Sequence, residues 1–128
     1  MSDEILDHLR LELRRGSLSL AVLAELREEQ CGYTLRKILA TSGLDIEESA
    51  LYPMLRRLET QGLLNSQWRE EDRRNKRFYK LSAEGKKLLS ELIKEWRELN
   101  TALERVVTQE RGHGTAESLS KRRRNSAA

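Results

Sequence analysis

The sequence predicts a mainly α-helical fold that carries one two-stranded β-hairpin and ends in a long helix. Three observations lead to this expectation. A chain of 128 residues with one proline and seven glycines favours helices over turn-rich β-structure. Leucines recur at intervals of three and four residues through most of the first 107 positions, which is the helical period. A period of two flanks the polar segment 69–75 and indicates a hairpin there.

The N-terminal part predicts two successive helices. Residues 3–14 carry leucines at helical spacing, and Gly16 then interrupts the pattern. Ser17 can cap a second helix, whose residues 18–26 are apolar on nearly all sides. Such a helix is typical of the buried centre of a domain, and Cys31 lies close to its expected end.

The next two helices are joined by a short connection. Residues 35–39 set the apolar face of a helix that stops near Gly43. The following helix runs from about Glu48 to Gln61 and carries Pro53, which removes one backbone hydrogen bond. We expect a mild distortion there, because the proline lies near the start of the helix.

Residues 63–69 and 76–81 are predicted to be the two strands of the hairpin. A hairpin on a small helical core is a winged helix-turn-helix arrangement, which is the expected fold class. Ser82 can cap the last helix, which extends to about Val107. Its apolar stripe is Leu88, Leu92, Trp96, Leu99, Leu103 and Val106, and Leu89, Ile93 and Val107 widen it. This spacing is typical of a helix that packs lengthwise against other helices.

The chain is long enough for one domain with a modest core, and we expect four segments in it. Residues 1–14 form an N-terminal helix that packs on the dimer helices, and residues 15–81 form the winged helix-turn-helix. Residues 82–107 form a dimerisation helix. Residues 108–128 form a disordered basic tail, because they have no apolar period.

Several functional classes are disfavoured by the sequence. Cys31 is the only cysteine, which suits a reducing, cytoplasmic location. No apolar run approaches the roughly 20 residues of a membrane span, and no signal peptide opens the chain. No His, Cys or acidic cluster has metal-ligand spacing, and no nucleophile and base form a set. We therefore expect no membrane partner, metal, cofactor or enzymatic activity.

The net charge of +3 does not by itself predict a nucleic-acid partner. Residues 111–128 hold five basic residues and one acidic residue, so residues 1–110 hold 19 basic and 20 acidic ones. Phosphate attraction is local within a Debye length of about 10 Å, and the prediction therefore depends on clusters of basic residues.

Two polar and basic clusters flank the predicted core. The helix beginning at Glu48 carries, outside its apolar face, Ser49, Tyr52, Arg56 and Arg57. The hairpin tip carries Arg73, Arg74, Lys76 and Arg77. One element can enter the major groove of double-stranded DNA while the other neutralises phosphates beside it.

The string from Glu48 to Leu64 (ESALYPMLRRLETQGLL) resembles the recognition helix of the PadR family of bacterial transcriptional regulators. Residues 77–85 (RFYKLSAEG) resemble the second wing strand and the start of the last helix of that family. Residues 32–35 (GYTL) resemble the beginning of its helix-turn-helix. The resemblance covers about residues 15–107.

This resemblance implies a homodimeric DNA-binding protein, usually a repressor, that dimerises through its C-terminal helix. It adds Tyr33 and Pro53 to the DNA-binding candidates, and members often respond to small aromatic or lipophilic compounds. Two-fold symmetry predicts an inverted-repeat operator. The dimerisation candidates are Leu6, Leu9, Leu88, Leu92, Ile93, Trp96, Leu99, Leu103 and Val106.

Alternatives remain open for the same residues. Arg56 and Arg57 could lie on a solvated helix face, with Arg56 paired to Glu59 or Thr60. Trp96 and its symmetry mate could sandwich a planar aromatic ligand, or could simply fill the dimer core. The acids at positions 47 and 48 would repel phosphates. This motivates a winged-helix protein-interaction adaptor, and the Trp96 cleft motivates a small-molecule sensor, neither binding DNA directly.

Overall fold

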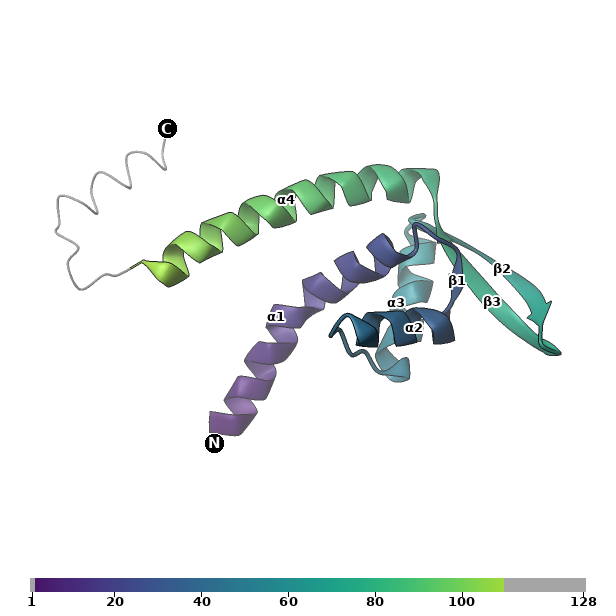
Figure 1. The fold of residues 1–128 in the computed structure, drawn as a ribbon, viewed down its shortest axis with the longest axis horizontal. Coiled ribbons are helices and arrows are strands. Elements are labelled where there is room, and N and C mark those ends of the chain that lie inside the picture. Colours follow the sequence, from purple (N-terminus) through teal and green to yellow (C-terminus); the bar gives the residue numbers. More distant parts are fainter. Residues whose placement is uncertain (1, 110–128) are drawn as a thin grey trace. The chain divides into compact units, whose positions relative to one another are not determined.

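The structure, a computed structural model, describes residues 2–109. Its elements in chain order are α1 (Ser2–Glu25), β1 (Gln30–Cys31), α2 (Gly32–Thr41), α3 (Glu48–Thr60), β2 (Leu64–Glu71), β3 (Arg74–Leu81) and α4 (Ala83–Thr108) (Figure 1). A mainly helical chain with a hairpin and a long last helix confirms the predicted fold class. The predicted basic tail lies outside the described residues, apart from its first two positions.

The chain divides into two compact units. The first ends at Lys94 and holds α1, α2, α3, the sheet and the beginning of α4. The second begins at Glu95, and its described part is the remainder of α4. None of the helices within residues 2–109 has the length and apolar character of a membrane span.

An aliphatic core lies in the first unit, between the C-terminal half of α1, α2, α3 and the base of the hairpin. Its most enclosed side chains are Val22, Leu23, Leu26, Leu35, Leu39, Leu51, Leu55 and Leu64. Leu89 is buried in the same cluster and ties the start of α4 to it. The spacing of Leu51, Leu55 and Leu58 places one face of α3 inward, so its opposite face is left outside.

A three-stranded antiparallel sheet forms the wing, with strand order β1-β3-β2. Leu64 pairs with Leu81 at the base, and Glu71 pairs with Arg74 at the tip. The two-residue turn places Asp72 at φ 52° and Arg73 at φ 65°, both in the left-handed region that tight hairpins use. The strands therefore extend closer to the tip than the predicted ranges 63–69 and 76–81.

Strand β1 is absent from the prediction, which treated Cys31 only as the end of a helix. Gln30 pairs with Tyr79 and Cys31 with Phe78, so this short segment forms the third strand. The strand leads directly into α2 at Gly32. It therefore joins the base of the wing to the start of the helix-turn-helix.

The first helix corrects a second expectation. The break predicted at Gly16 and Ser17 is wrong, because α1 runs without interruption from Ser2 to Glu25. A glycine inside a helix costs only about 0.5–1 kcal/mol relative to alanine. The strong helix formers on both sides of Gly16 outweigh this cost.

The ends of α2, α3 and α4 follow the signals in the sequence. Gly43 and Gly62 adopt φ of 88° and 82° directly after α2 and α3, as C-terminal stops require. At the start of α4, the backbone N–H of Gly85 donates to the Ser82 hydroxyl at 2.9 Å, which confirms the predicted cap. Helix α3 continues through Pro53 to Thr60.

Candidate nucleic-acid interface

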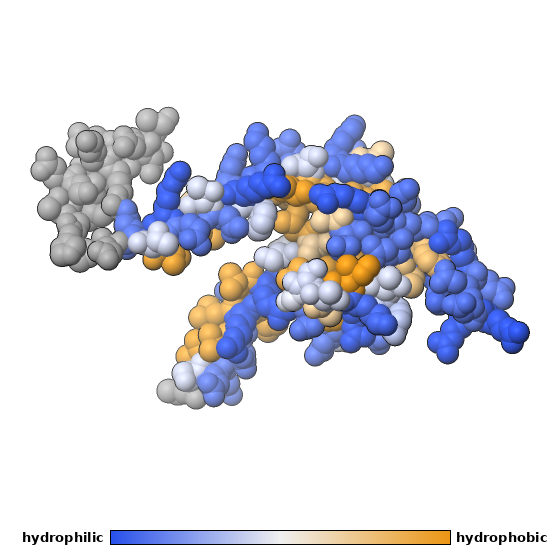
Figure 2. Space-filling model, viewed as in Figure 1, coloured by the Kyte–Doolittle hydropathy of each residue, from blue (hydrophilic) through white to orange (hydrophobic). Residues whose placement is uncertain are grey.

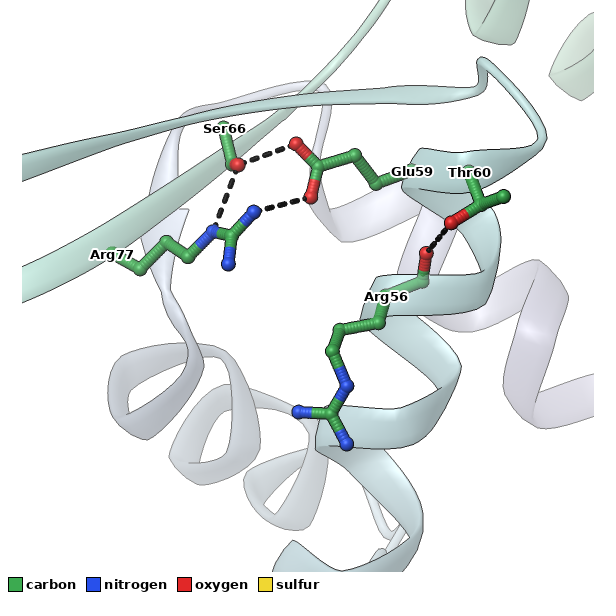
Figure 3. Close-up of polar contacts among 5 residues, drawn as sticks. All are labelled: Arg56, Glu59, Thr60, Ser66 and Arg77. Atoms are coloured by element: carbon green, nitrogen blue, oxygen red, sulfur yellow. Dashed lines mark hydrogen bonds and ion pairs between the residues drawn. The ribbon is translucent and has the colours of Figure 1, made fainter.

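Helix α3 presents a polar ridge on the side opposite its apolar face. Ser49, Pro53, Arg56 and Arg57 are all exposed, as their spacing predicts. The Arg56 guanidinium forms no hydrogen bond or ion pair with any residue in the range 2–109. Thr60 donates its hydroxyl to the backbone carbonyl of Arg56 at 2.9 Å and leaves the guanidinium alone (Figure 3).

A cleft of about 690 Å³ lies where α3, the start of α2 and the wing meet. Six of the residues predicted to bind DNA line it, namely Tyr33, Tyr52, Arg56, Arg74, Lys76 and Arg77. Trp68 and Tyr79 also line it. Ser49, Pro53, Arg57 and Arg73 lie outside the cleft, on exposed positions of α3 and the wing tip. The fold thus gathers candidates that are up to 44 positions apart in the sequence.

Tyr52 enters the cleft from α3 and lies against Gly32. A Cβ atom added to Gly32 would be 2.6 Å from Tyr52 Cε1, so only glycine permits this approach. Burial raises the pKa of the Tyr52 hydroxyl, and the nearby Glu48 carboxylate raises it further. The hydroxyl therefore stays protonated at neutral pH and can donate a hydrogen bond to a phosphate or sugar oxygen.

The wing tip also holds cations that form no ion pair. Arg73 and Arg74 are exposed and form no ion pair with a described residue. Lys76 is closer to compensation, because its Nζ lies 3.4 Å from the Glu71 carboxylate. The hairpin end is accordingly one of the most hydrophilic regions of the visible surface (Figure 2).

Arg77, which was predicted to contact DNA, is bound by other side chains of the same chain. Its Nη2 donates to the Glu59 carboxylate at 2.8 Å, and its Nε donates to the Ser66 hydroxyl at 2.9 Å (Figure 3). Ser66 in turn donates to Glu59 at 2.5 Å. The Arg56–Glu59 pair considered from the sequence is not formed, and Glu59 accepts from Ser66 and Arg77 instead.

The acids at the start of α3 are partly neutralised. Arg36 of α2 lies 3.1 Å from the Glu48 carboxylate and also donates to the backbone carbonyl of Ile46 at 3.0 Å. The Glu47 side chain forms no cap hydrogen bond. The predicted repulsion of phosphate therefore falls mainly on Glu47, which weakens the main argument for an adaptor that avoids DNA.

Cys31 is buried at the edge of the same cleft. Burial alone would raise the pKa of its thiol, but several interactions oppose it. The Thr34 hydroxyl lies 3.4 Å from the sulfur, and the backbone of Thr34 and the charge of Lys76 also favour the thiolate. The net effect lowers the pKa of this thiol below its ordinary value.

Apolar side chains remain exposed on two helices. On α1 they include Leu6 and Leu9, and Figure 2 shows apolar surface along the N-terminal part of this helix. On α4 the exposed positions are Leu88, Leu92, Trp96, Leu99, Leu103 and Val106. Ile93 differs from the other dimerisation candidates, because it is half-buried and packs against the core of the first unit.

Four site residues were missed by sequence reasoning: Glu29, Arg36, Glu59 and Ser66. Glu29 accepts an ion pair from Arg69 at 2.6 Å, and the other three form the contacts described above. Glu59 and Arg77 are 18 positions apart on different elements, so no local pattern in the sequence joins them. No group of three or more His, Cys, Asp or Glu residues in the range 2–109 is arranged to hold a metal ion.

Comparisons with known proteins agree with this architecture. Residues 20–91 match the model of the family described as the transcriptional regulator PadR-like family. The chain is similar to transcriptional regulator Rv3488 of Mycobacterium tuberculosis, with 33% identity over 81 residues, covering 62% of this chain and 76% of that protein. A PadR family regulator from Eggerthella lenta superposes with TM-score 0.77 and 39% identity, covering 85% of this chain and 97% of that chain. A PadR-like transcription factor from Bacteroides fragilis gives TM-score 0.66 and 29% identity, covering 77% and 98% of the two chains.

Proposed function

Because the chain belongs to the PadR-like family of transcriptional regulators, we propose that it works as a homodimeric repressor that binds double-stranded DNA. Family membership makes it a transcriptional regulator and not an enzyme. The proposal adds direct DNA contact, two-fold assembly and an inverted-repeat operator, with action in the cytoplasm, where bacterial DNA lies.

One observation carries the DNA-binding proposal. Several arginines have no carboxylate partner among the described residues, and four of them lie on α3 or at the wing tip, namely Arg56, Arg57, Arg73 and Arg74. An unpaired guanidinium can bind a phosphate without first breaking an ion pair. In the proposed complex α3 occupies the major groove, and the wing follows the adjacent backbone.

A salt titration tests this proposal. The probe is a labelled duplex recovered from a random pool by repeated selection on the full-length protein. Two copies of the four arginines give a log–log slope of up to about −7 if each neutralises one phosphate. A slope near zero, or a pool that yields no bound duplex, would reject DNA binding.

The homodimer is supported by the exposed apolar face of α4. Leu99 and Leu103 are 58% and 49% exposed, although aliphatic side chains at helical spacing normally pack. A second copy that supplies the same face would cover them through a two-fold interface. Leu6 and Leu9 of α1 are also exposed, and we propose that they too take part in dimerisation. Sedimentation of the full chain as a single monomeric species would reject this part.

We further propose that a small aromatic or lipophilic effector releases the protein from DNA. Trp96 is 42% exposed and belongs to the apolar face of α4. Between two α4 helices, paired indoles would bind a planar ring, and the effector would release DNA only by favouring a DNA-incompetent spacing. Quenching of Trp96 fluorescence in a Trp68→Phe variant by planar aromatics tests it. Unchanged fluorescence across the panel would favour the alternative, in which Trp96 only fills the dimer core.

A further inference from the structure

Three side chains from three different elements form a closed polar ring at the base of the wing. Glu59 lies on α3, Ser66 on β2 and Arg77 on β3. The Glu59 carboxylate accepts from Ser66 at 2.5 Å and from Arg77 at 2.8 Å, and Arg77 donates to Ser66 at 2.9 Å (Figure 3). The side chains of Glu59 and Arg77 are only 27% and 34% exposed, so the ring is partly shielded from water.

The ring holds one face of the wing against the recognition helix. Ser66 pairs with Tyr79 and Trp68 pairs with Arg77, so the side chains of Ser66 and Arg77 lie on the same face of the hairpin. Gln67 and Arg69 point to the opposite face. There they bind a second carboxylate, that of Glu29, at 3.0 and 2.6 Å. One carboxylate therefore binds each face of the wing, Glu59 on one face and Glu29 on the other.

We propose that Glu59 is a positioning residue, which fixes the wing against α3 through Ser66 and Arg77 and thereby sets the preference for the operator over other DNA. This inference rests on the DNA-binding function proposed above. Both Glu59 oxygens accept hydrogen bonds from the same chain, so we assign this carboxylate to positioning and not to direct recognition of DNA. Arg77 likewise binds within the ring, so the phosphate contacts of the wing are made by Arg73 and Arg74 at its tip.

The lever arm of the wing makes such a tie important. The tip lies six residues beyond Ser66, which is about 20 Å at the rise of an antiparallel strand. A tilt on the order of 10° at the base would move the tip by about 3 Å over that length, roughly the length of one hydrogen bond. A loosened base would therefore blur the position of Arg73 and Arg74 without removing their charge.

Folding does not depend on the ring in the same way. Leu64 and Leu81 anchor the base of the hairpin in the core, and both are buried. An ion pair that water still reaches, as here, contributes little to the free energy of folding. The loss of Glu59 should therefore change the geometry of binding more than the amount of folded protein.

The experiment compares two variants that remove the same charge near the wing. Glu59→Met deletes the ring acceptor and keeps an unbranched helix former. Glu70→Met is the matched control, because Glu70 is exposed on β2 and its side chain forms no hydrogen bond or ion pair with a described residue. The probes are the selected duplex and a random duplex of equal length. The measured quantity is the specificity ratio, which is the dissociation constant for the random duplex divided by that for the selected duplex.

We expect Glu59→Met to lower this ratio about tenfold, whereas Glu70→Met keeps it within about twofold of the wild-type value. In Glu59→Met the freed Arg77 should also steepen the salt slope on the random duplex by up to about two units, one for each copy in the proposed dimer. Equal ratios in wild type and Glu59→Met would overturn the inference. An unchanged or shallower slope would overturn it too, because Arg77 would then already contact phosphate in the wild type.

Two further variants separate positioning from a loss of folding. The exchange Glu59→Arg with Arg77→Glu should restore most of the ratio, since the Ser66 hydroxyl can serve both partners in either order. If Glu59→Met does not fold, Ser66→Ala decides the question, and a wild-type ratio in that variant would overturn the inference. Failure of the proposed function is a different outcome, in which the wild-type protein binds neither duplex.

Discussion

The value of each arginine for DNA binding depends on whether a carboxylate already holds it. Arg36, Arg69 and Arg77 each lie within 3.1 Å of an acidic oxygen, whereas Arg56 has no such partner in the described part of the chain. A guanidinium that already binds a carboxylate has its charge partly neutralised and fewer donors left for a phosphate, so its net gain on binding DNA is smaller. Although basic and acidic residues nearly balance in number, some arginines on the surface have no acidic partner and can bind phosphate.

The first prediction concerns Arg56. Arg56→Ala should weaken binding of the selected duplex by about 1–3 kcal/mol, because α3 would lose an unpaired cation on its exposed ridge. Fluorescence anisotropy at fixed salt measures the change. Arg27→Ala is the control, since Arg27 is also exposed and unpaired within residues 2–109 but lies outside the cleft and the wing. Equal affinity in the two variants would remove Arg56 from the interface.

The second prediction concerns alkaline pH. Burial raises the pKa of Tyr52 and of Tyr79 above their ordinary value of 10.0. Above about pH 10 the unfolded chain loses these protons while the folded protein keeps them. The contribution of these two groups to the free energy of unfolding should therefore be complete below pH 10 and should be lost as the pH rises further.

Urea titrations at several pH values from 8 to about 11 measure this effect over the range where tyrosine ionises. Tyr79→Phe should lose less stability than wild type over that range. Tyr33→Phe removes an exposed hydroxyl and should retain the wild-type dependence. A wild-type dependence in Tyr79→Phe would contradict the assignment of the effect to buried tyrosine.

At the scale of elements, the sequence is most informative where a long periodic pattern agrees with a local stop signal. The bounds of α3 follow from the leucine period and Gly62, and the cap of α4 follows from Ser82. Strand β1 has only two residues, which is too short for any period. Its position depends on pairing with β3, a contact across almost 50 positions of sequence.

The site is predictable to a similar extent. Residue type and helical spacing identify Arg56 and Tyr52 as outward-facing, and the structure places both in one cleft. They do not predict that Arg77 forms an ion pair with Glu59, because these two residues belong to different elements. The break expected at Gly16 fails for the opposite reason, because a local signal is overruled by its helical neighbours.

The third prediction uses two glycines in helices with opposite surroundings. A Cβ atom on Gly85 would collide with the Leu63 carbonyl oxygen and lie 2.8 Å from Leu81 Cδ1, whereas nothing lies within 4 Å of one on Gly16. Gly85→Ala should therefore destabilise the protein by about 1–3 kcal/mol. Gly16→Ala should stabilise it by about 0.5–1 kcal/mol, since alanine is the better helix former.

Urea unfolding of the two variants gives the comparison directly. Its value is that the same substitution, in the same type of element, should have opposite signs. Stabilisation by Gly85→Ala would show that α4 does not pack closely against the backbone of Leu63. Destabilisation by Gly16→Ala would show that the middle of α1 is packed against something other than solvent.

At the scale of the whole molecule, one protomer supplies one copy of α3 and one wing, which is half of the proposed interface. Two-fold assembly would repeat them on the DNA at a separation of one or two helical turns, about 34 Å each. The gain from a second half-site on the same duplex is an avidity effect, and it disappears when the protomers separate. Dimerisation and operator binding should therefore fail together.

The last prediction tests that link on α4. Leu103→Glu places a charge on the exposed apolar face, and Thr101→Glu places the same charge on the opposite side of the same helix. Burying an unpaired carboxylate in a dimer interface is strongly unfavourable, so Leu103→Glu should sediment as a monomer while Thr101→Glu remains a dimer. The monomer should bind the selected duplex at least about 100-fold more weakly, because it retains one half-site only. Circular dichroism checks that both variants stay helical. A dimeric Leu103→Glu protein would move the interface away from this face of α4, and a monomer with wild-type affinity would show that one protomer alone recognises the operator.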